Sequence, residues 1–141
     1  MSITADARHE LAGVLAAGMP GWSVYAEPPG TIHAPAIAFG PGDPYREPAA
    51  YRVDDVKLRL WLLLSEGSQL ILDQMDAALD ELLALLRTQP TVAVDRVAAV
   101  GSVREVGGVG YVAAVVDVSL GIERERTAAG RRVMEPEGAA V

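Results

Sequence analysis

The residues whose spacing best suits chemistry are Asp73, Asp76 and Asp80, which follow one another at intervals of three and four positions. On a helix this spacing puts the three carboxylates on one face. There they can hold a metal ion or work as an acid–base group. A solvated helix face has the same composition far more often. We therefore expect these aspartates to face water.

Other candidate catalytic groups fail on geometry. Asp54 and Asp55 are adjacent in a segment with strand periodicity, so their side chains point to opposite faces of the strand. The two histidines, His9 and His33, have no second histidine three or four positions away, which is the spacing of helical zinc sites. Without a well-placed histidine, a serine nucleophile has no base. We predict no catalytic residue, no metal ion and no cofactor, and we expect the protein not to be an enzyme.

Two glycine-rich segments do not fit nucleotide binding. The segment Gly40–Pro44 reads GPGDP, and its two prolines lack the N–H groups that a phosphate cradle needs. The segment Gly107–Gly110 lies between two valine-rich stretches and is typical of a hairpin turn. Both segments therefore predict turns.

Composition narrows the class of protein. The chain has 141 residues, enough for one domain, and a net charge of −7. A negative charge argues against a surface that grips nucleic acid, because such surfaces neutralise phosphates with Lys and Arg. The absence of cysteine excludes disulfides. The N-terminus lacks the pattern of a signal peptide, and apolar runs such as Leu60–Leu64 are too short for a membrane span. We expect a soluble protein made in a cytoplasm, with no membrane partner.

Apolar periodicity predicts an α+β fold: a mostly antiparallel sheet of about four to six strands, with two main helices packed on it. Ser2 or Thr4 can cap the first helix and Ser68 the second. Gly101 is expected to mark a bulge or a turn between the stretch Val92–Val100 and the last hairpin. The predicted elements are helices at 3–18 and 68–87, strands at 22–26, 36–39 and 53–64, a long loop at 40–52, and hairpin-linked strands across 91–122.

The strand predicted at 53–64 has two different faces. One is aliphatic throughout and belongs in a core, whereas the other begins with Lys57 and Arg59 and ends with Trp61 and Leu63. The apolar end needs a cover, and we expect either a second helix or another subunit to supply it. Further along, Asp117 can pair across the sheet with Arg96 or Arg104.

Aromatic and arginine side chains are the strongest functional signal, since Trp, Tyr and Arg anchor protein interfaces. Trp61 can serve in this way or pack beneath a helix of its own chain. After Glu123 the β pattern gives way to charge, alanine and glycine. We divide the chain into a domain at 1–122 and an extension at 123–141, and expect a neighbouring subunit or partner to order the extension. The candidate interface residues are Tyr45, Arg46, Tyr51, Arg52, Trp61, Arg131 and Arg132.

The order of these segments resembles tail-terminator, or tail-completion, proteins of long-tailed bacteriophages (siphoviruses) that infect actinobacteria. The likeness covers about residues 3–122 and is strongest at Pro35–Tyr45, PAIAFGPGDPY, and Val56–Leu64, VKLRLWLLL. It implies an α+β structural virion protein that assembles in the host cytoplasm as a homo-hexameric ring. Such a ring sits at the neck, caps the tail tube, ends tube polymerisation and meets the head-closure or connector protein in head–tail joining.

The resemblance also implies partners and a lumen. The partners are further copies of the chain, the tail-tube protein and the head-closure protein, while DNA passes through the lumen without specific binding. Acidic residues suit a lumen wall because like charges do not hold phosphates. The candidates for that wall are Asp43, Glu47, Asp54 and Asp55.

Two alternatives stay open. The chain can be another neck protein, such as a head-closure or minor tail protein, which differs from a terminator in its partners. It can also be a small ligand-binding α+β domain, which requires a concave apolar pocket with convergent polar groups.

Overall fold

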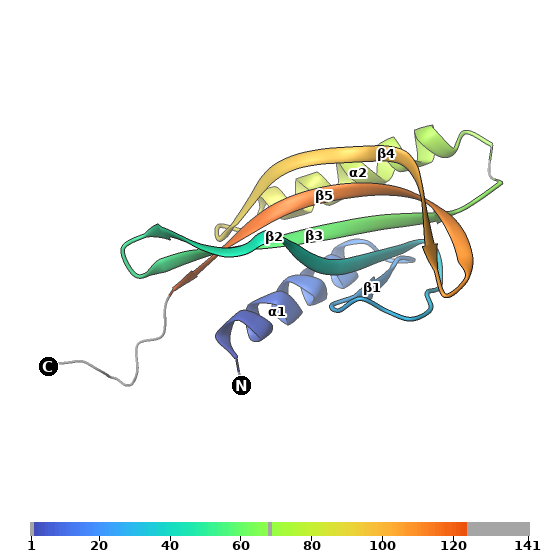
Figure 1. Ribbon diagram of the computed structural model, residues 1–141. Helices are drawn as coiled ribbons and strands as arrows, with labels where there is room; N and C mark the ends of the chain where they lie inside the picture. Colours follow the sequence, from blue (N-terminus) through green and yellow to red (C-terminus); the bar gives the residue numbers. More distant parts are fainter. Residues whose placement is uncertain (1, 68, 124–141) are drawn as a thin grey trace, which may run out of the picture.

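The computed structural model describes residues 2–67 and 69–123. Two helices pack on a five-stranded, mostly antiparallel sheet, which confirms the predicted α+β fold (Figure 1). The strand order is β1-β2-β3-β5-β4, and only β1 runs parallel to its neighbour. The elements are α1 (Ile3–Gly18), β1 (Ser23–Tyr25), β2 (Ala36–Ala50), β3 (Val53–Ser65), α2 (Ile71–Arg87), β4 (Val92–Val106) and β5 (Val109–Glu123).

The first helix begins and ends as its sequence predicts. The Ser2 hydroxyl accepts a hydrogen bond from the Ala5 N–H at 3.2 Å, which satisfies one free donor of the first turn. After Gly18 the Met19 N–H donates to the Leu15 carbonyl and closes the helix. The helix that these two ends define packs against the sheet, and its Leu15 is fully buried.

The second helix has an unusual start. It begins at Ile71, and the preceding Leu70 has left-handed backbone angles and no side-chain hydrogen bond to the helix. The spacing of Leu70 fits the apolar stripe of the helix predicted at 68–87, but the residue stands outside the first turn and is 72% exposed. The predicted cap, Ser68, lies outside the described residues. Arg87 lies in the last turn, where a cation suits the helix dipole.

The long loop predicted at 40–52 was wrong. Strand β2 continues through this segment to Ala50 and pairs with β3, so the loop shrinks to Tyr51 and Arg52. The prolines are tolerated because β1 pairs with β2 only at residues 36–38, and beyond them the strand lies at the sheet edge, where a missing N–H costs little. The register also shifts between Pro41 and Arg46. The result is a long β2–β3 hairpin at one end of the molecule, residues 41–58, which we call the arm; the end of β5 pairs with its β3 half (Figure 1).

The last hairpin agrees closely with the prediction. Strands β4 and β5 are joined by Gly107 and Gly108, both with positive φ as a tight I′-type turn requires. The turn is shorter than the predicted Gly107–Gly110 segment because β5 already begins at Val109. The bulge expected at Gly101 is confirmed, since the register shifts between Ala98 and Ser102 and Gly101 has φ +87°.

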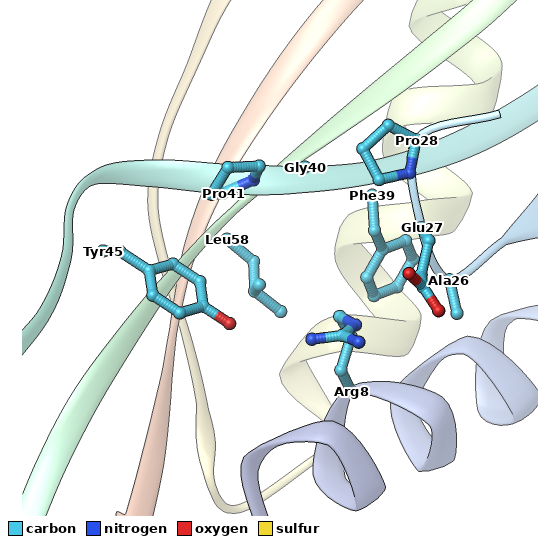
Figure 2. Close-up of a pocket in the computed structure, with 9 residues that line it drawn as sticks. All are labelled: Arg8, Ala26, Glu27, Pro28, Phe39, Gly40, Pro41, Tyr45 and Leu58. Atoms are coloured by element: carbon cyan, nitrogen blue, oxygen red, sulfur yellow. The ribbon is translucent and has the colours of Figure 1, made fainter. Parts of the chain in front are cut away.

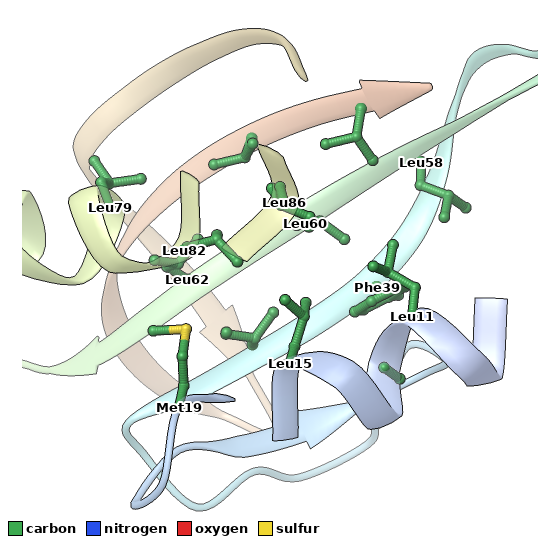
Figure 3. Close-up of a cluster of buried hydrophobic side chains, with 14 of the residues drawn as sticks. Leu11, Leu15, Met19, Phe39, Leu58, Leu60, Leu62, Leu79, Leu82 and Leu86 are labelled. Carbon is green, nitrogen blue, oxygen red and sulfur yellow. The ribbon is translucent and has the colours of Figure 1, made fainter. Parts of the chain in front are cut away.

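Both helices cover the same face of the sheet. The aliphatic face of β3, which includes Leu60, packs against side chains from both helices (Figure 3). They are Leu15 and Met19 at the end of α1 and Leu82 and Leu86 on α2. These side chains are all nearly or fully buried. Burying one leucine side chain contributes roughly 1.5–3 kcal/mol, so this layer is the main source of stability.

The opposite face of the sheet has a cover that we did not expect. Leu63 is fully buried there, yet the segments that shield it are not helical. Instead Ile32, from the segment after β1, and Tyr111, from the last hairpin, join it in a second small core. The hairpin turn also touches that segment: a Cβ on Gly107 would lie 2.6 Å from the Gly30 carbonyl oxygen. No other segment within residues 2–67 and 69–123 covers the rest of this face, and we call it the open face.

Candidate functional site

The arm carries four of the predicted interface residues. Tyr51 stands at its turn and is 85% exposed, and the Arg52 guanidinium lies 5.5 Å from the centre of the Tyr51 ring. Arg46 is held back against the body: its guanidinium donates to Asp54 at 3.1 Å and to the Thr4 hydroxyl at 3.3 Å. The arm therefore presents Tyr51 and Arg52 outward while Arg46 ties its root to α1.

Tyr45 differs from its neighbours because it faces a pocket. This pocket of about 140 Å³ lies between α1, the turn after β1 and the middle of β2 (Figure 2). Arg8 enters it from α1, and its Nε is buried with no hydrogen-bond partner among the described residues. Phe39 and Leu58 supply apolar wall. Sequence reasoning missed Arg8, since a single arginine four positions from the buried Thr4 and Ala12 has no pattern to mark it.

Trp61 lies on the open face, not beneath either helix. It packs against the small core around Leu63, and the Arg104 guanidinium covers its ring at 3.8 Å. Both residues line a pocket of about 220 Å³ together with Pro28 and Pro29. The alternative of packing under a helix of the same chain was therefore wrong, and the interface role of Trp61 stays a prediction.

Charged side chains form two short chains of contacts across the open face. Asp117 accepts hydrogen bonds from Arg59 at 3.0 Å and from Arg96 at 2.6 Å, which confirms the predicted Arg96 pairing. Next to it, Lys57 donates to the Ser119 hydroxyl at 2.8 Å, and that hydroxyl donates to Asp95 at 2.6 Å. The cross-strand register places these residues side by side on three strands.

The environment of Asp117 changes its acidity. Partial burial raises the pKa of a carboxyl group, because it disfavours the charged form. The hydrogen bonds from Arg96 and Arg59, together with their positive charges, outweigh this term and hold the pKa of Asp117 below its ordinary value. Asp117 therefore stays ionised and links β3 to β4 through β5.

The four predicted lumen carboxylates do not share one face. Asp54 bonds Arg46, which also reaches Thr4 on α1, so Asp54 lies on the helix side. Asp55 lies on the open face, as the alternation of a strand requires, beside Lys57. Glu47 pairs with Asp55 in register and contacts Lys57 at 3.7 Å, and Asp43 borders a hollow of about 400 Å³ on the same face. Three acids thus gather on the open face, each near a basic group.

Several predictions about sites concern residues that stand apart. The carboxylates of Asp73, Asp76 and Asp80 are exposed on α2. Within residues 2–67 and 69–123, no group of three or more His, Asp or Glu side chains is placed to hold a metal ion. In the same ranges neither helix combines the length and hydropathy of a membrane span. Arg131 and Arg132, with the rest of the extension beyond Glu123, lie outside the described residues.

The structure also reveals apolar exposure that the sequence did not predict. Five side chains surround the start of α2 and the bulge of β4, and we call them the α2–β4 patch. They are Leu70, Leu72, Val97, Val100 and Val103. The one available signal in the sequence was the glycine within a valine-rich strand, Gly101.

Comparisons of the chain with protein-family models and with curated proteins gave no match.

Proposed function

We propose that this protein is a tail terminator: a structural virion protein whose ring caps the tail tube, ends tube polymerisation and joins the tail to the head connector. The resemblance of residues 3–122 to actinophage tail-completion proteins motivates this proposal. The structural observation that carries it is the arm, which holds an exposed tyrosine and an arginine at its turn, away from the main core. Such residues are typical anchors of protein interfaces.

The proposed partners follow from that role. Copies of the chain form the ring, one side of the ring meets the tail-tube protein, and the other meets the head-closure protein in the neck of the virion. A closed ring needs contacts between two different surfaces of each copy. The arm and the α2–β4 patch are two different exposed surfaces of this chain.

DNA would pass through such a ring without being held. The net charge of −7 favours a lumen that repels phosphates. Asp43, Glu47 and Asp55 on the open face are the best-placed carboxylates for that wall, whereas Asp54 lies on the helix side.

The first test is the mass of the purified protein by light scattering over a range of concentrations. A mass near six chains supports the ring. The second test adds the protein to a cognate tail-tube protein during polymerisation and measures tube lengths by electron microscopy. A terminator shortens the tubes and is found at one end of each.

The outcomes separate the alternatives. Binding to the head-closure protein without any effect on tubes would favour another neck protein. A monomer that neither shortens tubes nor binds neck proteins would contradict the proposal. It would favour the ligand-binding domain, and the pocket around Arg8 and Tyr45 would then be the place to look for the ligand.

A further inference from the structure

The α2–β4 patch is continuous across two elements. A Cβ placed on Gly101 would lie 3.3 Å from a methyl group of Leu72, so the bulge of β4 touches the start of α2. Around this contact Leu72 is 53% and Val103 67% exposed, beside the exposed Leu70. Contiguous apolar side chains in water mark surfaces that another molecule covers.

Backbone conformation marks the same places. Among the described residues, three that are not glycine have positive φ: Arg52 at 62°, Leu70 at 59° and Ala99 at 55°. Side chains disfavour this region by roughly 1–2 kcal/mol per residue, and such outliers gather at functional positions. Leu70 belongs to the α2–β4 patch and Ala99 to the bulge beside it, whereas Arg52 forms the turn of the arm.

The arm and the patch belong to different parts of the sheet. Strand β4 is the outermost strand on one side, whereas the arm is built from β2 and β3 on the other (Figure 1). A contact between the arm of one copy and the patch of the next leaves a free arm and a free patch at the ends. It can therefore repeat until a ring closes.

Charge agrees with this pairing. Asp73 and Asp76 are exposed on the first turns of α2 next to Leu72, and the only basic residue of this helix is Arg87 at its far end. The turn of the arm presents Arg52. Opposite charges across a contact steer association and fix its register.

The contact must be made by side chains, not by joining the two sheets. Pro41, Pro44 and Pro48 remove N–H groups from β2, and the bulge at Gly101 interrupts β4. Both devices protect sheet edges from pairing with another strand.

We propose that the turn of the arm of one copy docks on the α2–β4 patch of the next copy. Tyr51 covers Leu72 and Val103, and Arg52 lies near Asp73 and Asp76. This inference rests on the proposed function, because the ring supplies the second copy.

Disulfide trapping tests the contact directly, since the chain has no cysteine of its own. Tyr51→Cys and Val103→Cys are prepared as separate proteins, mixed and oxidised. We expect a cross-linked dimer in the mixture and at least about tenfold less in either protein alone, an effect of about 1.4 kcal/mol in relative contact population. The double variant should give a ladder of larger species. Ala84→Cys, which is exposed on α2 but lies near the end of that helix away from the patch, replaces Val103→Cys in the control mixture.

Three results would overturn the inference: equal cross-linking in the Ala84→Cys control, equal cross-linking of Val103→Cys with itself, or no cross-linking. If the unmodified protein still has the mass of a ring, only this contact is wrong and the proposed function stands. If it is monomeric and leaves tail tubes unchanged, the proposed function fails as well.

Charge reversal gives a second measurement that does not depend on oxidation. Arg52→Glu and Asp73→Arg should each weaken self-association about tenfold, and an equimolar mixture of the two should recover part of it. Circular dichroism checks that both variants fold. Loss without recovery in the mixture would contradict the pairing of Arg52 with Asp73.

Discussion

The guanidinium carbon of Arg104 lies 3.8 Å from the centre of the Trp61 ring. Trp61 is on β3 and Arg104 on β4, and β5 runs between the two strands. A cation above an indole face is attracted by the electron-rich face of the ring quadrupole, which contributes about 0.5–1 kcal/mol at exposed positions and more when water is excluded. This pair therefore fastens the outer end of the last hairpin over the open face.

Replacing Arg104 with alanine should loosen that end of the sheet. We expect a loss of about 1 kcal/mol in the free energy of unfolding, measured by urea titration. The emission of Trp61 should also change in a Trp22→Phe background, because its ring loses its cover. Arg104→Lys is the control: it keeps the charge but not the planar group, so it should retain part of the stability. Unchanged emission in the alanine variant would contradict the stacked arrangement.

The carboxylate of Asp117 should make stability depend on acid. Its pKa is lowered in the folded protein, with burial opposed by Arg96 and Arg59. A group with a lowered folded pKa contributes stability that is fully present above its unfolded pKa, about 4. That contribution disappears as the pH falls through the lower folded pKa. We expect Asp117→Asn to cost about 1–2 kcal/mol at neutral pH and progressively less below pH 4.

Urea unfolding at several pH values measures this dependence. Asp80→Asn, on the exposed face of α2, is the matched control and should leave the profile unchanged. A constant difference between Asp117→Asn and the unmodified protein down to pH 2 would show that Asp117 is not the titrating group.

Much of the fold could be predicted because its patterns are local. The aliphatic alternation of Val56–Leu64 and the leucine stripe of α2 each fix one element by periodicity alone. The arm could not be predicted from the sequence, because Gly40–Pro44 has the composition of a loop. Whether such a segment forms a strand depends on two things that lie outside it. One is a strand to pair with, here β3, and the other is an outer edge where no neighbouring strand requires backbone N–H donors.

The candidate surfaces were predicted less well for a related reason. Exposure depends on which elements lie beside a residue, and sequence periodicity does not report that. Leu70 fits the stripe of α2 by spacing, yet it precedes the helix and is exposed. From the sequence, we expected a helix or another subunit to cover Trp61. In the structure, Arg104, two strands away, covers its ring.

The contact between the last hairpin and the turn after β1 predicts a difference between two adjacent glycines. Gly107 and Gly108 both have positive φ, so alanine at either position should cost about 1–2 kcal/mol for its backbone. Only at Gly107 would the new Cβ collide with another segment, at 2.6 Å from the Gly30 carbonyl oxygen. Gly107→Ala should therefore be clearly less stable than Gly108→Ala. Equal melting temperatures would show that the hairpin turn and the Gly30 turn are not in contact in solution.

The bonds of Arg46 to Asp54 and Thr4 predict how firmly the arm is held. Removing them with Arg46→Ala should raise amide hydrogen exchange in the arm about fivefold, which corresponds to about 1 kcal/mol for a largely solvent-exposed ion pair. Mass spectrometry of peptides covering residues 41–58 measures the rate. Arg52→Ala is the control on the same arm, because Arg52 contacts only the neighbouring Tyr51 ring among the contacts found in the described chain. An equal increase in both variants would mean that arm mobility is set at its turn, and that its tie to α1 contributes nothing.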